Sequence, residues 1–165
     1  MIHAASHIQR SFQLAAPVEA AWALLADVPR WGVLFPHVES VEPFQPPDNP
    51  PDGDRQRGEA FVWRMAPLGP PGARVETVYA CRYTAEPERH ALAWTPIDDV
   101  GNARFAGSCV LDDRGDVTAG TLRLEATLEI PAPSFVRAIV EPAVAAEMGR
   151  MTDTFIGRLD AALRS

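Results

Sequence analysis

The chain has 165 residues, of which 47% are hydrophobic and 22% charged, as in an ordinary water-soluble globular protein. Its formal net charge of −7 argues against a nucleic-acid partner or an anionic membrane surface, because each of those needs a basic field. The sequence has no run of about 18 apolar residues with which to cross a bilayer, so no stable membrane insertion is expected.

Cysteine and histidine content narrows the chemistry further. The two cysteines, Cys81 and Cys109, form no CxxC pair, and the four histidines have no metal-ligand spacing with them, so neither a metal nor another cofactor is expected. The N-terminal segment lacks the basic and apolar regions of a secretory signal, which predicts a cytoplasmic protein. Residues 1–165 have the length of one domain and are interpreted as one.

The beginning of the chain predicts a strand followed by two short helices. Apolar residues alternate over 7–16, which is typical of a half-buried strand. Residues 17–28 predict a helix whose first turn suits Pro17. Because Pro29 prevents simple continuation, residues 29–35 are expected to form a second short helix or a turn.

Pro36 and His37 follow the second helix and allow two interpretations. A histidine at this place could act in acid–base catalysis, or the pair could simply turn the chain into the next strand. No partner for His37 is identifiable in the sequence. We therefore interpret His37 as a corner residue.

Six further strands are expected, at residues 37–44, 59–66, 74–85, 90–96, 103–113 and 121–130. A polar loop rich in proline and glycine separates the first two of them, at residues 45–58. The connections between the others are short, which indicates an antiparallel sheet. One face of these strands is charged and the other is apolar and aromatic, so the second face must be covered.

A long amphipathic helix, from Pro133 to Leu163, supplies that cover. Its apolar residues recur at spacings of four and three: Val136, Val140, Val144, Met148, Met151, Phe155 and Leu159. A helix of about 30 residues is about 45 Å long, enough to cross the sheet. Pro142 lies inside it, where we expect a kink or a break.

The order of these elements resembles that of the START-like helix-grip superfamily (SRPBCC). Two segments carry the resemblance: SFQLAAPVEAAWALLADVPRWGVLFPHVESVE and GTLRLEATLEIP. That superfamily includes polyketide cyclase/dehydrase-like and coenzyme Q-binding proteins. The resemblance implies an α+β fold of the helix-grip type. In that fold a seven-stranded curved antiparallel sheet, in the order β-α-α-β6-α, wraps around the long C-terminal helix. It also implies an apolar cavity between sheet and helix that holds a lipid, a quinone or a polyketide.

The side chains expected to face this cavity and bind its ligand are Trp31, Phe35, Phe61, Trp63, Tyr79, Cys81, Tyr83, Trp94, Phe105, Met148 and Met151. The same residues would also make an ordinary filled core. Members of the superfamily that catalyse cyclisation place titratable groups in the cavity, but no inward-facing carboxylate or histidine is evident here.

No catalytic residue is assigned, and only two weak candidates exist. The hydroxyls of Tyr79 and Tyr83 could orient a carbonyl or act as general acids, or could be satisfied hydroxyls of the core. Cys81 and Cys109 have no base nearby in the sequence, so we interpret both as small buried hydrophobic residues.

Three functions remain open. The first is binding of a hydrophobic small molecule, for transport or sequestration. The second is a cyclase, dehydratase or aromatase acting on a polyketide-like substrate through the cavity tyrosines. The third is a protein-interaction module without a ligand, which would carry an exposed apolar patch. A homodimer could form through the edge strand at 38–44, although Pro43 and Pro46 disfavour such pairing.

Overall fold

The computed structural model describes residues 1–45, 58–69 and 74–165, so most of the proline-rich loop expected at 45–58 lies outside the described residues. Its strands are β1 (Ile2–Leu14), β2 (Val38–Pro43), β3 (Glu59–Leu68), β4 (Val75–Glu86), β5 (Ala91–Pro96), β6 (Ala103–Arg114) and β7 (Val117–Ile130). Its helices are α1 (Val18–Leu25), α2 (Trp31–Leu34) and α3 (Arg137–Arg164), with single 3₁₀ turns at Val28–Arg30, Pro87–Arg89 and Ser134–Val136.

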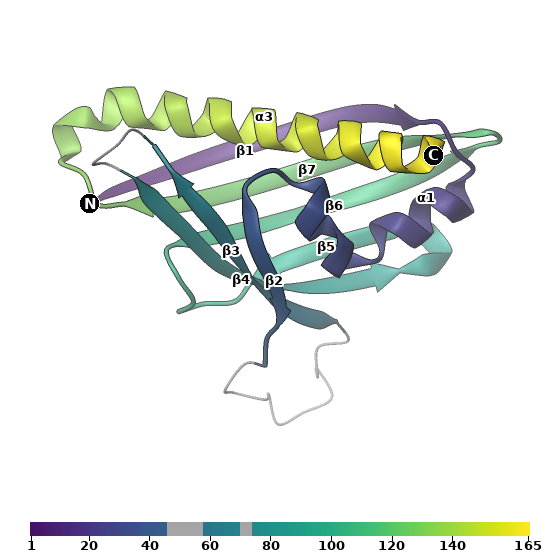
Figure 1. Ribbon diagram of the computed structural model, residues 1–165, viewed down its shortest axis with the longest axis horizontal. Coiled ribbons are helices and arrows are strands. Elements are labelled where there is room, and N and C mark those ends of the chain that lie inside the picture. Colours follow the sequence, from purple (N-terminus) through teal and green to yellow (C-terminus); the bar gives the residue numbers. More distant parts are fainter. Residues whose placement is uncertain (46–57, 70–73) are drawn as a thin grey trace.

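The strands form one antiparallel sheet in the order β1-β7-β6-β5-β4-β3-β2. The sheet curves around α3, which lies beside β1 and crosses its concave side (Figure 1). This is the helix-grip α+β fold that the sequence predicts. β1 and β2 are the edge strands, and pairing of β2 in a homodimer stays a prediction. No helix in the described segments is both long and apolar enough to cross a membrane.

Alternation along the central strands decides which side chains enter the concave side. On β7, Leu122 and Leu124 are buried, whereas Arg123 between them points to the other face. Gly107 on β6 allows a close approach of an aromatic ring to the sheet, because a Cβ there would lie 2.4 Å from the ring of Trp94. The sheet can therefore carry large aromatic side chains on its concave face without being pushed apart.

α3 continues through Pro142 without the break that the sequence suggested. The helix begins at Arg137, so Pro142 lies in its second turn. A proline at this position removes only the hydrogen bond to the carbonyl of Ala138. The rest of the helix keeps its hydrogen bonds, and the local loss is tolerated.

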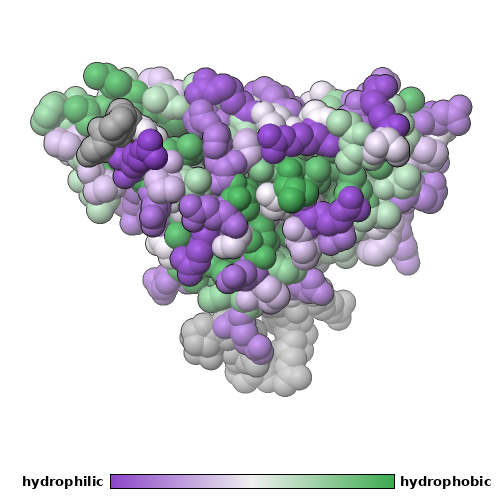
Figure 2. All heavy atoms as spheres, in the orientation of Figure 1, coloured by the Kyte–Doolittle hydropathy of each residue, from purple (hydrophilic) through white to green (hydrophobic). Residues whose placement is uncertain are grey.

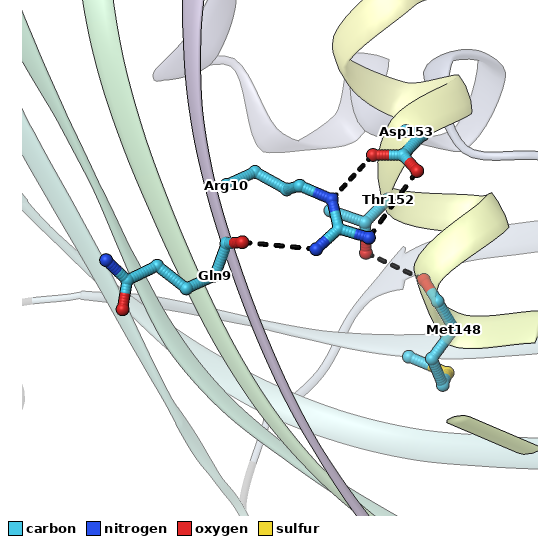
Figure 3. A network of polar contacts seen from close by, with 5 residues as sticks. All are labelled: Gln9, Arg10, Met148, Thr152 and Asp153. Atoms are coloured by element: carbon cyan, nitrogen blue, oxygen red, sulfur yellow. Dashed lines mark hydrogen bonds and ion pairs between the residues drawn. The ribbon is translucent and has the colours of Figure 1, made fainter. Parts of the chain in front are cut away.

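The second half of α3 is fixed to the sheet by both apolar and polar contacts. Phe155 and Leu159 are fully buried. Arg10 of β1 donates from Nε to Asp153 Oδ1 at 2.7 Å (Figure 3). The backbone amide of Ala15 donates to Asp160 at 2.8 Å, and this bond is the main reason that the pKa of Asp160 is lowered.

The first half of α3 is attached differently. Val136, Val140 and Val144 are only half-buried and pack against a small second cluster that contains Ile2 and Ile130. No polar contact between α3 and the rest of the described chain lies before Glu147. The apolar stripe predicted along the helix is therefore fully buried only in its second half.

The attachment of the second half gives a testable stability prediction. Phe155 stacks on Phe35 with ring centroids 4.2 Å apart and lies 5.0 Å from the centroid of Trp31. We expect Phe155→Ala to lower the free energy of unfolding by about 3–5 kcal/mol, because it leaves a cavity among these rings. Ile139→Ala, at a side chain that is 75% exposed, should change it by less than about 0.5 kcal/mol. Urea denaturation measures both, and similar values for the two variants would contradict this account.

Candidate functional site

A cavity of about 970 Å³ lies between the sheet and the first half of α3. Its walls come from β1, α2, β3, β4, β5, β6, β7 and α3, and the exposed Ile139 near the start of α3 also borders it. Cavities that bind small molecules have volumes of about 300–1,000 Å³ and mostly apolar walls. The space is thus large enough for a sizeable organic molecule.

The structure brings nine of the eleven expected ligand-binding side chains together on the cavity wall: Trp31, Phe35, Trp63, Tyr79, Tyr83, Trp94, Phe105, Met148 and Met151. Trp31 stands at the centre of the aromatic group, with its ring centroid 5.4 Å from that of Trp94 and 5.7 Å from that of Tyr83. Its Nε1 donates to the carbonyl of Leu25 at 2.9 Å, which fixes the orientation of the indole. These residues form the aromatic end of the cavity.

Phe61 and Cys81 do not border the cavity. Phe61 packs against the ring of Tyr83, with centroids 6.0 Å apart, and is buried in the core. Cys81 Sγ donates to the carbonyl of Phe105 at 3.3 Å. Both side chains share the inward face of their strands with the cavity residues, and the period of two cannot separate core from wall on one face.

A second set of lining residues forms an aliphatic end under the first half of α3: Ala4, Leu68, Val75, Leu128, Ile130, Val136, Val140 and Val144. Sequence reasoning did not propose these positions as ligand-binding. The valines were visible as part of the helical stripe, but their spacing is the same whether a helix packs on a core or over an empty space. Most of this set belongs to the small second cluster, separate from the aromatic residues.

The hydroxyls of Tyr79 and Tyr83 lie at the aromatic end. Burial raises the pKa of each well above its usual value, and the neighbouring Cys81 adds to the effect. Both phenols therefore keep their protons at neutral pH and are able to donate a hydrogen bond to a ligand.

Ionisable side chains other than tyrosine also border the cavity, contrary to the expectation that no histidine or carboxylate faces inward. They are His37, Arg74, Glu147 and Arg150. His37 forms the corner that the sequence predicts, with φ of 66° and a carbonyl that accepts from the amide of Ala66 at 2.7 Å. Its imidazole nevertheless reaches the cavity wall.

Glu147 is the partner of His37 that the sequence did not reveal. His37 Nε2 lies 3.7 Å from Glu147 Oε1, and Arg150 donates to Glu147 Oε2 from Nη2 at 2.6 Å and from Nε at 3.0 Å. Glu147 and Arg150 lie on α3, far from His37 in the chain. Glu147 and Arg150 pair because they lie three residues apart on the helix, and the crossing of α3 over the sheet brings His37 to them.

A family model described as polyketide cyclase / dehydrase and lipid transport matches residues 5–164. The chain belongs to this family. Membership places it in a fold that binds small molecules and supports a ligand-binding or cyclase role. No curated protein sequence matches the chain.

Solved structures share the fold of this family member. The Zhui aromatase/cyclase from Streptomyces sp. R1128 has 16% identity and a TM-score of 0.65, over 98% of this chain and 97% of that one. A START superfamily protein from Mycobacterium smegmatis has 11% identity and a TM-score of 0.64, over 94% and 98%. Norcoclaurine synthase from Thalictrum flavum has 17% identity and a TM-score of 0.60, over 100% and 99%.

The cysteines of this family member give a prediction about reactivity. Burial raises the pKa of Cys81 and of Cys109 to about 12. At pH 8 about one thiol in ten thousand is then ionised, and the thiolate is the reactive form. We expect neither cysteine to react with a soluble aromatic disulfide in the folded protein, and both to react in denaturant. Absorbance of the released thiol measures this, and rapid reaction of the folded protein would contradict it.

Proposed function

We propose that the protein binds a hydrophobic small molecule, such as a lipid, a quinone or a polyketide, in the cavity between the sheet and α3, and that it carries or sequesters this molecule. The observation that supports this most is the lining of the 970 Å³ cavity, which is aromatic at one end and aliphatic at the other. A ligand that buries about 300 Å² of apolar surface there would gain about 7 kcal/mol, before the costs of ordering.

The attachment of α3 also supports a binding role. The first half of the helix and the 3₁₀ turn before it contact the sheet through three half-buried valines and border the cavity. A ligand under these valines would cover apolar surface that the protein alone leaves partly exposed. Binding would therefore stabilise the part of the fold that is held most weakly.

Exposed apolar side chains at the start of α3 bear on the third function considered, a protein-interaction module. Phe135 is 85% exposed and Ile139 is 75% exposed, and hydrophobic side chains gather at this end of the molecule (Figure 2). Ile139 also borders the cavity. We therefore interpret this patch as the rim of the entrance through which a ligand passes.

A cyclase, dehydratase or aromatase acting on a polyketide-like substrate is the second candidate function. It is favoured by the hydroxyls of Tyr79 and Tyr83, which border the cavity and stay protonated. Two donors of this kind could hold a carbonyl oxygen and stabilise the negative charge that develops on it.

Native mass spectrometry of the protein purified from its own host tests the binding function. We expect a bound apolar molecule in the wild type and its loss, or at least a tenfold weaker affinity, in Ala143→Trp, because the indole would occupy the cavity that Ala143 borders. Ala145→Trp is the matched control, since both alanines are exposed on the same helix but Ala145 does not border the cavity. Equal binding by the two variants would contradict the proposed location, and no bound or bindable apolar molecule in the wild type would contradict the function.

The enzymatic alternative makes a different prediction. If the tyrosines act in a reaction, Tyr79→Phe or Tyr83→Phe should abolish turnover of the molecule identified by mass spectrometry and change its affinity less than about tenfold. Product formation and equilibrium binding would be measured for each variant. Wild-type protein that returns the molecule unchanged would exclude the enzyme and leave the carrier.

A further inference from the structure

Basic side chains outnumber acidic ones on the cavity wall, whereas the protein as a whole is acidic. The chain has a net charge of −7. Apart from the two tyrosines, the ionisable side chains that border the cavity within the described residues are three basic ones, His37, Arg74 and Arg150, and one acidic one, Glu147. A negatively charged protein thus places a locally basic group beside an apolar cavity.

Glu147 engages both of its oxygens with basic partners. Oε1 faces His37 at 3.7 Å, and Oε2 accepts two hydrogen bonds from Arg150. The carboxylate is therefore already paired with the Arg150 guanidinium, and it serves to position both the guanidinium and the imidazole. Arg150 uses only Nε and Nη2 in this contact, and in the described part of the chain no bond is formed by its Nη1.

The backbone holds His37 in place independently of its side-chain contact. Its φ of 66° lies in the left-handed region, and its carbonyl bonds to the amide of Ala66 on β3. Glu147 contacts it from α3, and Arg150 on the same helix contacts Glu147, so the group joins the corner before β2 to α3. On α3, Glu147 lies between Val144, which belongs to the aliphatic end of the cavity, and Met148, which belongs to the aromatic end. The carboxylate therefore stands where the two ends of the cavity meet.

We propose that His37, Glu147 and Arg150 form a site that recognises an acid, and that the molecule bound in the cavity is an amphiphile with an apolar body and a carboxylate or another ionised oxygen group. This inference rests on the proposed binding function and names the class of ligand. Imidazole and guanidinium donors on a cavity wall form charge-assisted hydrogen bonds with such an oxygen, which are stronger than bonds to a neutral group. Arg74 on the same wall adds to the positive potential.

Matched pairs of an acid and its primary amide test the proposal. 1-Pyrenebutyric acid and its amide carry an aromatic body, and cis-parinaric acid and its amide carry a chain, so the two pairs distinguish an aromatic acid from a fatty acid. We expect the purified wild-type protein to bind the acid of at least one pair about tenfold or more tightly than the amide, as measured by fluorescence titration.

Two substitutions should remove this preference. In the double variant His37→Asn, Arg150→Gln, the affinity for the acid should fall to that for the amide, and the affinity for the amide should stay unchanged. Asparagine is chosen at position 37 because it tolerates the left-handed backbone there. Thermal unfolding of the double variant should match that of the wild type, since both side chains are partly exposed.

His7→Gln is the matched control. His7 Nδ1 lies 3.6 Å from Glu125 Oε1, an almost identical histidine–glutamate distance, but this pair is exposed and does not border the cavity. The control should keep the preference for the acid. Equal affinity of the wild type for acid and amide, or a preference that survives in the double variant, would overturn the proposal and leave the binding function intact. Failure of all four probes to bind would count against both.

Discussion

The unequal attachment of α3 to the sheet is the constraint on which the rest of the structure depends. Phe155 and Leu159 fill the space against the aromatic group around Trp31, and Arg10 and Asp160 add polar ties at the same end. Aromatic rings of this size and close packing fix the height of the helix above the sheet. Towards its start, α3 passes over smaller side chains, and the separation set at the other end leaves a cavity there.

The two halves of α3 therefore have different roles: the second half stabilises the fold, and the first half borders the proposed binding cavity. The second half of α3 belongs to the main core, and its loss would unfold the protein. The part of α3 before Glu147 borders a cavity and has only apolar, half-buried contacts with the rest of the described chain, so it can contribute to ligand binding at small cost to the fold. Regions with few buried contacts open most easily, which suits the entrance of a cavity.

Alternation along the strands predicted which side chains face the cavity side of the sheet, but not which of them border the cavity. The period of two along β3 and β4 identified Trp63, Tyr79 and Tyr83 as inward-facing, and they border the cavity. The same pattern included Phe61 and Cys81, which are packed in the core, because alternation reports the face and not the depth. Pro142 was expected to disturb α3, but its effect depends on its distance from the helix start, which the sequence locates poorly.

The sequence by itself determined the fold class, because hydrophobic periodicity and short connections allow few arrangements of seven strands and one long helix. It also determined that Pro36 and His37 form a corner. Only the tertiary structure decided that this corner brings an imidazole to the cavity wall opposite Glu147 and Arg150. The physical reason is that periodicity is local, whereas a contact between a sheet corner and the middle of α3 depends on how far above the sheet the helix lies, which is set by the packing of Phe155 against Trp31 and Phe35.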